Sequence, residues 1–126
     1  MNTNDKKNNY RIKLDILFDN NNIATSNHNF NLIVQLLDVT FEDVIDNIIY
    51  KIKKEMNFKD VKNKKLEFVF DVEIHNLNKI YSFFILVDID KNNKISIGDY
   101  ISTDRHLFIP QDNNFSLQIK VYRVDS

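Results

Sequence analysis

Alternation of hydrophobic and polar residues is the main pattern in this chain of 126 residues. In residues 10–18 almost every second residue is apolar, and the same period of two recurs in residues 66–74 and 115–122. Successive side chains of a β-strand point to opposite faces, so this period predicts strands with one buried face. Residues 66–74 carry the clearest form of the pattern.

Three further segments also predict strands, and two of them are more continuously apolar. Residues 30–37 have few polar interruptions, which predicts a strand that is buried on both faces or lies near the centre of a sheet. Residues 80–89 and 95–101 also predict strands, while polar residues at 19–22 and 110–114 predict turns.

The segment 41–56 fits two structures. Thr40 and Asp43 resemble a helix capping box, and the apolar residues that follow recur at helical spacing, which favours one short helix over 41–56. However, Ile48, Tyr50 and Ile52 also alternate with polar residues, and the segment is rich in β-branched residues, which favours a strand.

The fold class expected from this pattern is all-β, an antiparallel β-sandwich of six to seven strands with at most that one helix. Residues 1–9 lack apolar periodicity and are expected to form a flexible polar tail. Residues 10–126 are expected to form a single β-sandwich domain, because 43% hydrophobic residues suffice for one core.

Charge and composition narrow the class of protein. With 17 basic and 18 acidic residues the net charge is −1, so no overall positive field favours binding to nucleic acid. No apolar run approaches the roughly 20 residues that cross a bilayer, and the first nine residues are polar where a secretory signal needs an apolar stretch. These features predict a cytoplasmic protein that does not insert into membranes.

The residues of common enzyme classes are missing. There is no Cys, and Gly98 as the only glycine excludes a Walker loop and a dinucleotide-binding fingerprint. His28, His75 and His106 are too far apart in sequence to form a recognisable zinc motif. We therefore expect no enzyme activity and no catalytic or cofactor-binding residues.

One acidic segment, residues 88–99, resembles a calcium-binding loop. Asp88, Asp90 and Asn92 occupy the first, third and fifth positions of the template D-x-[DN]-x-[DN]. The remaining candidate ligands would be the backbone carbonyl of Lys94, the hydroxyl of Ser96 or a water on it, and the carboxylate of Asp99. The cofactor implied by this hypothesis is Ca²⁺.

Two residues depart from that template. Asn93 stands where the template has Gly, and Asp99 replaces the longer Glu. The flanks predict strands, whereas an EF-hand has helices. An ordinary hairpin turn, with Asn92 and Asn93 supplying positive φ angles, is the alternative interpretation.

Lysines cluster at residues 51–54 and 62–65, where acidic residues lie nearby. This mixture favours a solvated surface over a site for polyanions. Lysines on an edge strand also discourage pairing with other chains.

Three segments together resemble the YbaY/YscW family of pilotin-like lipoprotein chaperones associated with type III secretion. They are residues 36–43 (LLDVTFED), 66–72 (LEFVFDV) and 81–90. The resemblance implies a compact β-sandwich in which a turn and then a strand follow Asp43, and it implies a protein partner bound through an exposed strand edge or face. The chain lacks the signal peptide and lipidated Cys of that family, so a membrane-anchored role is not expected.

Overall fold

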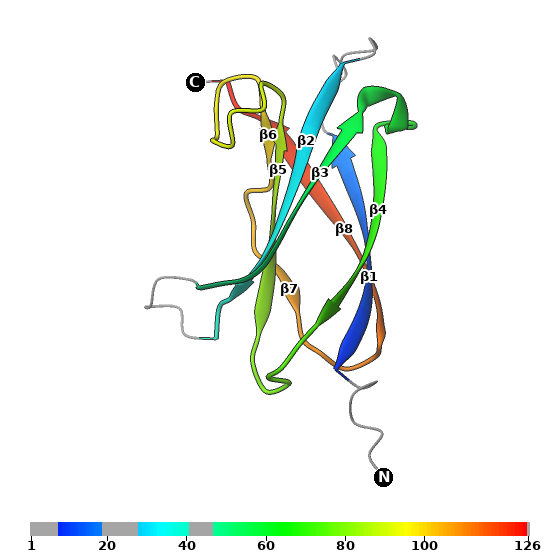
Figure 1. Ribbon diagram of the computed structural model, residues 1–126, viewed down its shortest axis with the longest axis vertical. Helices are drawn as coiled ribbons and strands as arrows, with labels where there is room; N and C mark the ends of the chain where they lie inside the picture. Colours follow the sequence, from blue (N-terminus) through cyan, green and yellow to red (C-terminus); the bar gives the residue numbers. More distant parts are fainter. Residues whose placement is uncertain (1–7, 19–27, 41–46, 126) are drawn as a thin grey trace.

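The computed structural model describes residues 8–18, 28–40 and 47–125, which form an all-β fold (Figure 1). The strands are β1 (Asn9–Phe18), β2 (Asn29–Asp38), β3 (Asn47–Asn57), β4 (Lys65–Glu73), β5 (Tyr81–Asp88), β6 (Tyr100–Ile101), β7 (His106–Phe108) and β8 (Asn114–Arg123). A single turn of 3-10 helix, η1 (Phe58–Asp60), follows β3. The helices in this described part of the chain include none that is long and apolar enough to cross a membrane.

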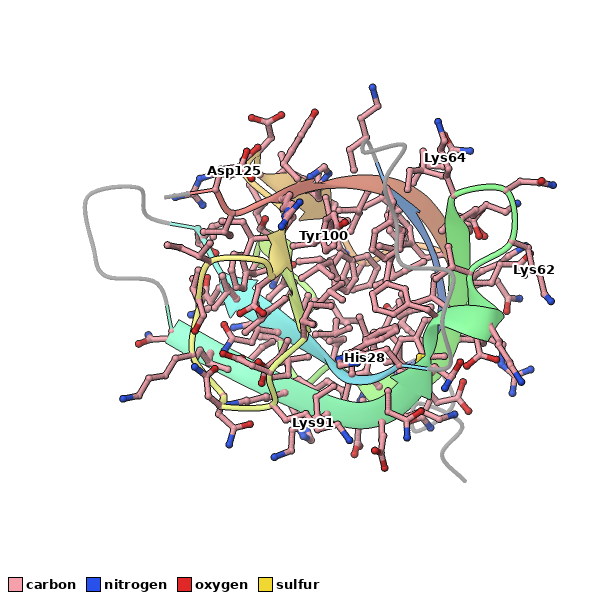
Figure 2. All side chains as sticks on the ribbon, turned by 90° about the horizontal axis from the view of Figure 1, so that it is seen from above. His28, Lys62, Lys64, Lys91, Tyr100 and Asp125 are labelled. Carbon is pink, nitrogen blue, oxygen red and sulfur yellow. The ribbon has the colours of Figure 1, made fainter. Side chains whose placement is uncertain are left out.

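The strands form one sheet in the order β3-β2-β5-β6-β8-β1-β4, and β7 pairs with the start of β5. Every pair is antiparallel except β1 with β8, which is parallel. The sheet is rolled up and nearly closed into a barrel shape, with side chains packed inside the ring of strands (Figure 2). The all-β prediction is confirmed, but the described strands form one rolled sheet of eight strands in place of a clear antiparallel sandwich of six to seven.

Alternate apolar side chains fill the inside of the rolled sheet, as the period of two predicts. The buried residues are Tyr10, Ile12, Leu14, Ile16 and Phe18 of β1, Leu66, Phe68, Phe70 and Val72 of β4, and Ile119 and Val121 of β8. Burial of one such side chain contributes about 1.5–3 kcal/mol. The alternation that predicts these strands therefore also stabilises them in the sheet, because it places their apolar side chains in the core.

Residues 47–57 form the strand β3, so the helix predicted over 41–56 is wrong for this part; residues 41–46 lie outside the described residues. β3 pairs with β2 in a register that places Ile52 opposite Val34, with a bulge near Leu37. The helical period and the strand period both fit this part of the sequence. The strand forms because it pairs with the otherwise free edge of β2. The strand implied by the family resemblance is confirmed here.

The strand predicted over 95–101 is also largely wrong, because only Tyr100 and Ile101 join the sheet as β6. The preceding residues belong to a loop that connects β5 to β6. β2 and β5 are each paired on both sides and carry buried residues on both faces, as the apolar run at 30–37 predicts for β2.

Candidate functional site

The acidic segment forms the loop between β5 and β6, drawn in yellow at one end of the rolled sheet (Figure 1). Its backbone has positive φ at Lys91 (57°), Asn93 (63°) and Gly98 (97°). Asn93 therefore adopts the left-handed conformation that the missing template glycine would have supplied. Gly98 has a φ that L-residues rarely adopt, which explains a glycine at that position.

Two buried carboxylates hold this loop through backbone hydrogen bonds. Asp88 is 0% exposed and accepts the backbone N–H groups of Asn92 (3.3 Å) and Asn93 (2.8 Å). Asp99 is 1% exposed and accepts those of Ile89 (2.8 Å) and Ser96 (2.9 Å). Each carboxylate thus bonds two donors of the loop backbone, so both side chains shape the loop.

Asp88, Asp90 and Asp99 form a carboxylate cluster, since one oxygen of each lies within 4.8 Å of the other two. Burial raises the pKa of Asp99, its two backbone hydrogen bonds lower it, and the charges of Asp90 and Asp88 raise it further. Within the described residues no ion pair joins any of the three to a basic side chain. Negative charge is therefore concentrated without a neutralising partner.

The side chains of the other predicted calcium ligands, Asn92 and Ser96, are engaged within the loop. The Asn92 side chain accepts the backbone N–H of Lys94 (2.9 Å) and donates to the hydroxyl of Ser96 (2.6 Å). Of the six predicted residues, the structure thus brings together the three that carry carboxylates, Asp88, Asp90 and Asp99. Asn92, Lys94 and Ser96 instead bond to one another.

The loop also folds over the outer face of the sheet. Lys91 forms an ion pair with Glu55 of β3, and Lys53 donates to the side chain of Asn93 (3.2 Å). Lys53 lies in one cross-strand row with Ile33 and Leu86, which point outward yet are only 3% and 5% exposed. We infer that the loop covers these two side chains.

The sequence pattern did not predict that this loop covers the outer face of the sheet. Its only signal in the sequence is that β2 and β5 carry apolar residues on both faces, without a helix to cover the outer one.

A second feature lies where the rolled sheet stays open. β3 and β4 are the two ends of the strand order in the described part of the chain, where they do not pair with each other. They are connected by η1 and by a tight turn in which Asn63 (54°) and Lys64 (63°) have positive φ. We call the space between these neighbouring strands the β3–β4 opening.

Side chains span the β3–β4 opening in place of backbone hydrogen bonds. The rings of Tyr50 and Phe70 stack with centroids 5.9 Å apart, and the ammonium of Lys54 lies 6.0 Å from the ring centroid of Phe68. Next to them is a groove of about 440 Å³, lined by Lys54, Glu55, Met56, Asp60, Lys62, Lys65, Leu66 and Glu67. The lining of this groove contains both basic and acidic side chains, together with apolar Met56 near the end of β3 and Leu66 near the start of β4.

A smaller hollow of about 190 Å³ contains two buried serines. Ser102 accepts the backbone N–H of Ile85 (2.9 Å), and Ser82 accepts that of His106 (3.0 Å). These hydroxyls position strand segments. In residues 8–18, 28–40 and 47–125 neither bonds to a carboxylate or to an imidazole ring.

No family model matches this chain, and no curated protein matches it. A solved structure described as an alternative pilotin from the type II secretion system of Vibrio cholerae is similar, with a TM-score of 0.69 and 16% identity over 94% of this chain and 99% of that one. A fimbrial assembly protein from Parabacteroides distasonis ATCC 8503 has a TM-score of 0.52 and 13% identity over 91% of this chain. This chain spans about half of that protein (53%). At such identities the likeness shows the fold alone, and that fold is pilotin-like.

Proposed function

We propose that this chain is a non-catalytic domain that binds a protein partner by adding an extended segment of that partner to the free edge of β3. The observation that carries the proposal is the β3–β4 opening. β3 has 11 residues and, among the described residues, pairs only with β2, so the other side of its backbone has no described strand beside it and can accept another strand.

Strand addition uses the backbone groups of the edge for affinity and the alternating side chains for specificity. The half-buried side chains of Tyr50, Ile52 and Met56 pack against the core at this edge. An added strand would cover them further, and burial of apolar area favours binding. The likeness to a pilotin and to a fimbrial assembly protein supports a protein as the partner class, because both names refer to multi-protein systems.

Amide hydrogen exchange tests the proposal. The probes are three peptides of about ten residues, a common strand length, which alternate Val with Glu, with Gln or with Lys. Successive residues of a strand point their N–H groups to opposite sides, so only alternate amides of β3 are bonded to β2. Binding of any of the peptides should slow exchange at the other amides of β3 and leave the amides of β8 unchanged. Protection elsewhere with none at β3 would contradict the proposal.

A second proposal is that the loop of residues 89–99 binds Ca²⁺ through the carboxylate cluster. The support is the convergence of Asp88, Asp90 and Asp99, with a raised pKa at Asp99 where three negative groups meet. Calcium takes oxygen ligands of this kind, and a cation would neutralise the cluster. Glu55 and Lys91 then fix the loop to β3 independently of the ion.

Thermal unfolding in EDTA and in millimolar calcium tests this second proposal. A ligand at ~100 times its Kd stabilises by about 2.7 kcal/mol, which raises the Tm of a domain of this size by several degrees. Asp90→Ala is the informative variant, because it removes the oxygen ligand, and Asp90 is exposed and holds none of the loop hydrogen bonds described above. The variant should keep the Tm of the wild type in EDTA and lose most of the rise in calcium. An equal Tm of the wild type in the two buffers would refute calcium binding.

A further inference from the structure

Positive charge is concentrated along β3 and the connection to β4. Residues 51–65 contain seven lysines and two acidic residues, a net charge of +5 in a chain whose total is −1. Lys51, Lys59 and Lys62 make no ion pair with the described residues. Figure 2 shows Lys62 and Lys64 pointing outward from the turn at the rim of the opening. The edge therefore attracts negative charge.

The two faces of β3 differ in chemistry. Lys51, Lys53 and Glu55 are exposed on the outer face, while Tyr50, Ile52 and Met56 turn toward the core. Lys54 shares this inner side, where its ammonium lies over the ring of Phe68. A strand that lies next to β3, about 4.8 Å away, places its own side chains on the same two faces. Its outward residues would lie beside Lys51 and Lys53, within the screening length of about 8 Å at physiological salt.

From this charge pattern we infer that the occupant of the β3 edge is an acidic extended segment of another protein, with Asp or Glu alternating with apolar residues. The inference rests on the proposed strand addition and specifies its partner. The acidic side chains lie against Lys51 and Lys53, and the apolar ones cover Tyr50, Ile52 and Met56. The lysines thereby select the partner by charge.

The same charges disfavour the β3 edge of a second copy. Antiparallel pairing of two β3 strands centred on Ile52 would place Lys51 opposite Lys53, and like charges directly opposite one another are destabilising. β4 is also acidic and alternating, but two of its carboxylates already bind basic side chains of the neighbouring strand β1. Asp71 pairs with Arg11 (3.1 Å) and Glu67 with Lys13 (3.7 Å). A separate acidic segment carries unpaired charge and fits better.

The experiment compares the Glu–Val, Gln–Val and Lys–Val peptides by fluorescence anisotropy at ~0.15 M salt. Two charge pairs predict that the Glu–Val peptide binds about tenfold more tightly than the Gln–Val peptide, and the Lys–Val peptide most weakly. The difference should shrink at ~1 M salt, where the screening length falls to about 3 Å.

The variants locate the effect. Lys51→Glu/Lys53→Glu should reverse the order of the three peptides, and Lys120→Glu/Arg123→Glu on β8 changes the net charge equally and should preserve it. Sedimentation of each protein checks for self-association.

Four results would overturn the inference. Equal affinity for the three peptides would remove the charge preference but keep strand addition, whereas binding of none would remove both. A preference for Glu–Val that survives in Lys51→Glu/Lys53→Glu would place the acidic segment elsewhere. A dimer that the Glu–Val peptide does not dissociate, and that this variant abolishes, would make a second copy the occupant.

Discussion

Replacing Asp99 by Asn measures what a buried carboxylate contributes to the loop between β5 and β6. Asp99 accepts two backbone N–H groups, from Ile89 (2.8 Å) and Ser96 (2.9 Å). The Asn side chain has one acceptor oxygen and one amino group, so only one of the two donors can keep its partner. A donor left without a partner in a buried site costs about 1–3 kcal/mol.

A second effect of Asp99→Asn has the opposite sign. The pKa of Asp99 is raised by burial and by the charges of Asp90 and Asp88, so removal of its charge relieves repulsion. We expect the lost hydrogen bond to dominate, because backbone N–H groups lie on both oxygens at short range while Asp90 is exposed. The expected net loss in the free energy of unfolding is about 1–2 kcal/mol.

Urea unfolding in EDTA, followed by far-UV circular dichroism, measures this difference. Asp90→Asn is the matched control, since it removes the same charge without a described hydrogen bond, and it should lie within about 0.5 kcal/mol of the wild type. If Asp99→Asn were as stable as Asp90→Asn, the carboxylate of Asp99 would not hold the loop backbone.

Three further predictions concern stability. Leu86→Ala should cost about 2–5 kcal/mol in urea unfolding, as in a core, because Leu86 is only 5% exposed on the outer face of the sheet; a cost under ~1 kcal/mol would mean that the loop does not cover it. Gly98→Ala should cost about 1–2 kcal/mol from backbone strain alone, since φ is +97° and an added Cβ meets nothing within 4 Å; an unchanged urea midpoint would contradict this. The ion pair with Lys79 (2.9 Å) and the hydrogen bonds from Thr40 lower the pKa of Asp38 to about 2, below its ordinary 3.8. Its contribution is therefore present above pH 3.8 and lost as the pH falls toward 2; Asp38→Asn should lose about 1–2 kcal/mol at pH 6 and much less at pH 2, a difference that pH-dependent urea unfolding checks.

The local pattern of the sequence determined the strands that alternate strictly and which of their side chains face the core. The period of two in residues 10–18, 66–74 and 115–122 reappears as the burial pattern of β1, β4 and β8. The spacing of Asp88, Asp90 and Asp99 also anticipated a cluster of carboxylates. Such features follow from side-chain direction along one strand or one loop, so they are readable without knowing the neighbours.

Only the tertiary structure decided how the strands pair. Every strand offers the same backbone donors and acceptors, so nothing local in β1 indicates its parallel pairing with β8 across some 100 residues. For the same reason the sequence of residues 47–57 fits both a helix and a strand, and only the pairing with β2 makes it a strand. The β3–β4 opening and the burial of Ile33 and Leu86 on the outer face depend on these distant contacts, because each needs strands that only the rolled sheet brings together, whereas the hydrogen bonds that Asp88 and Asp99 accept lie within one loop.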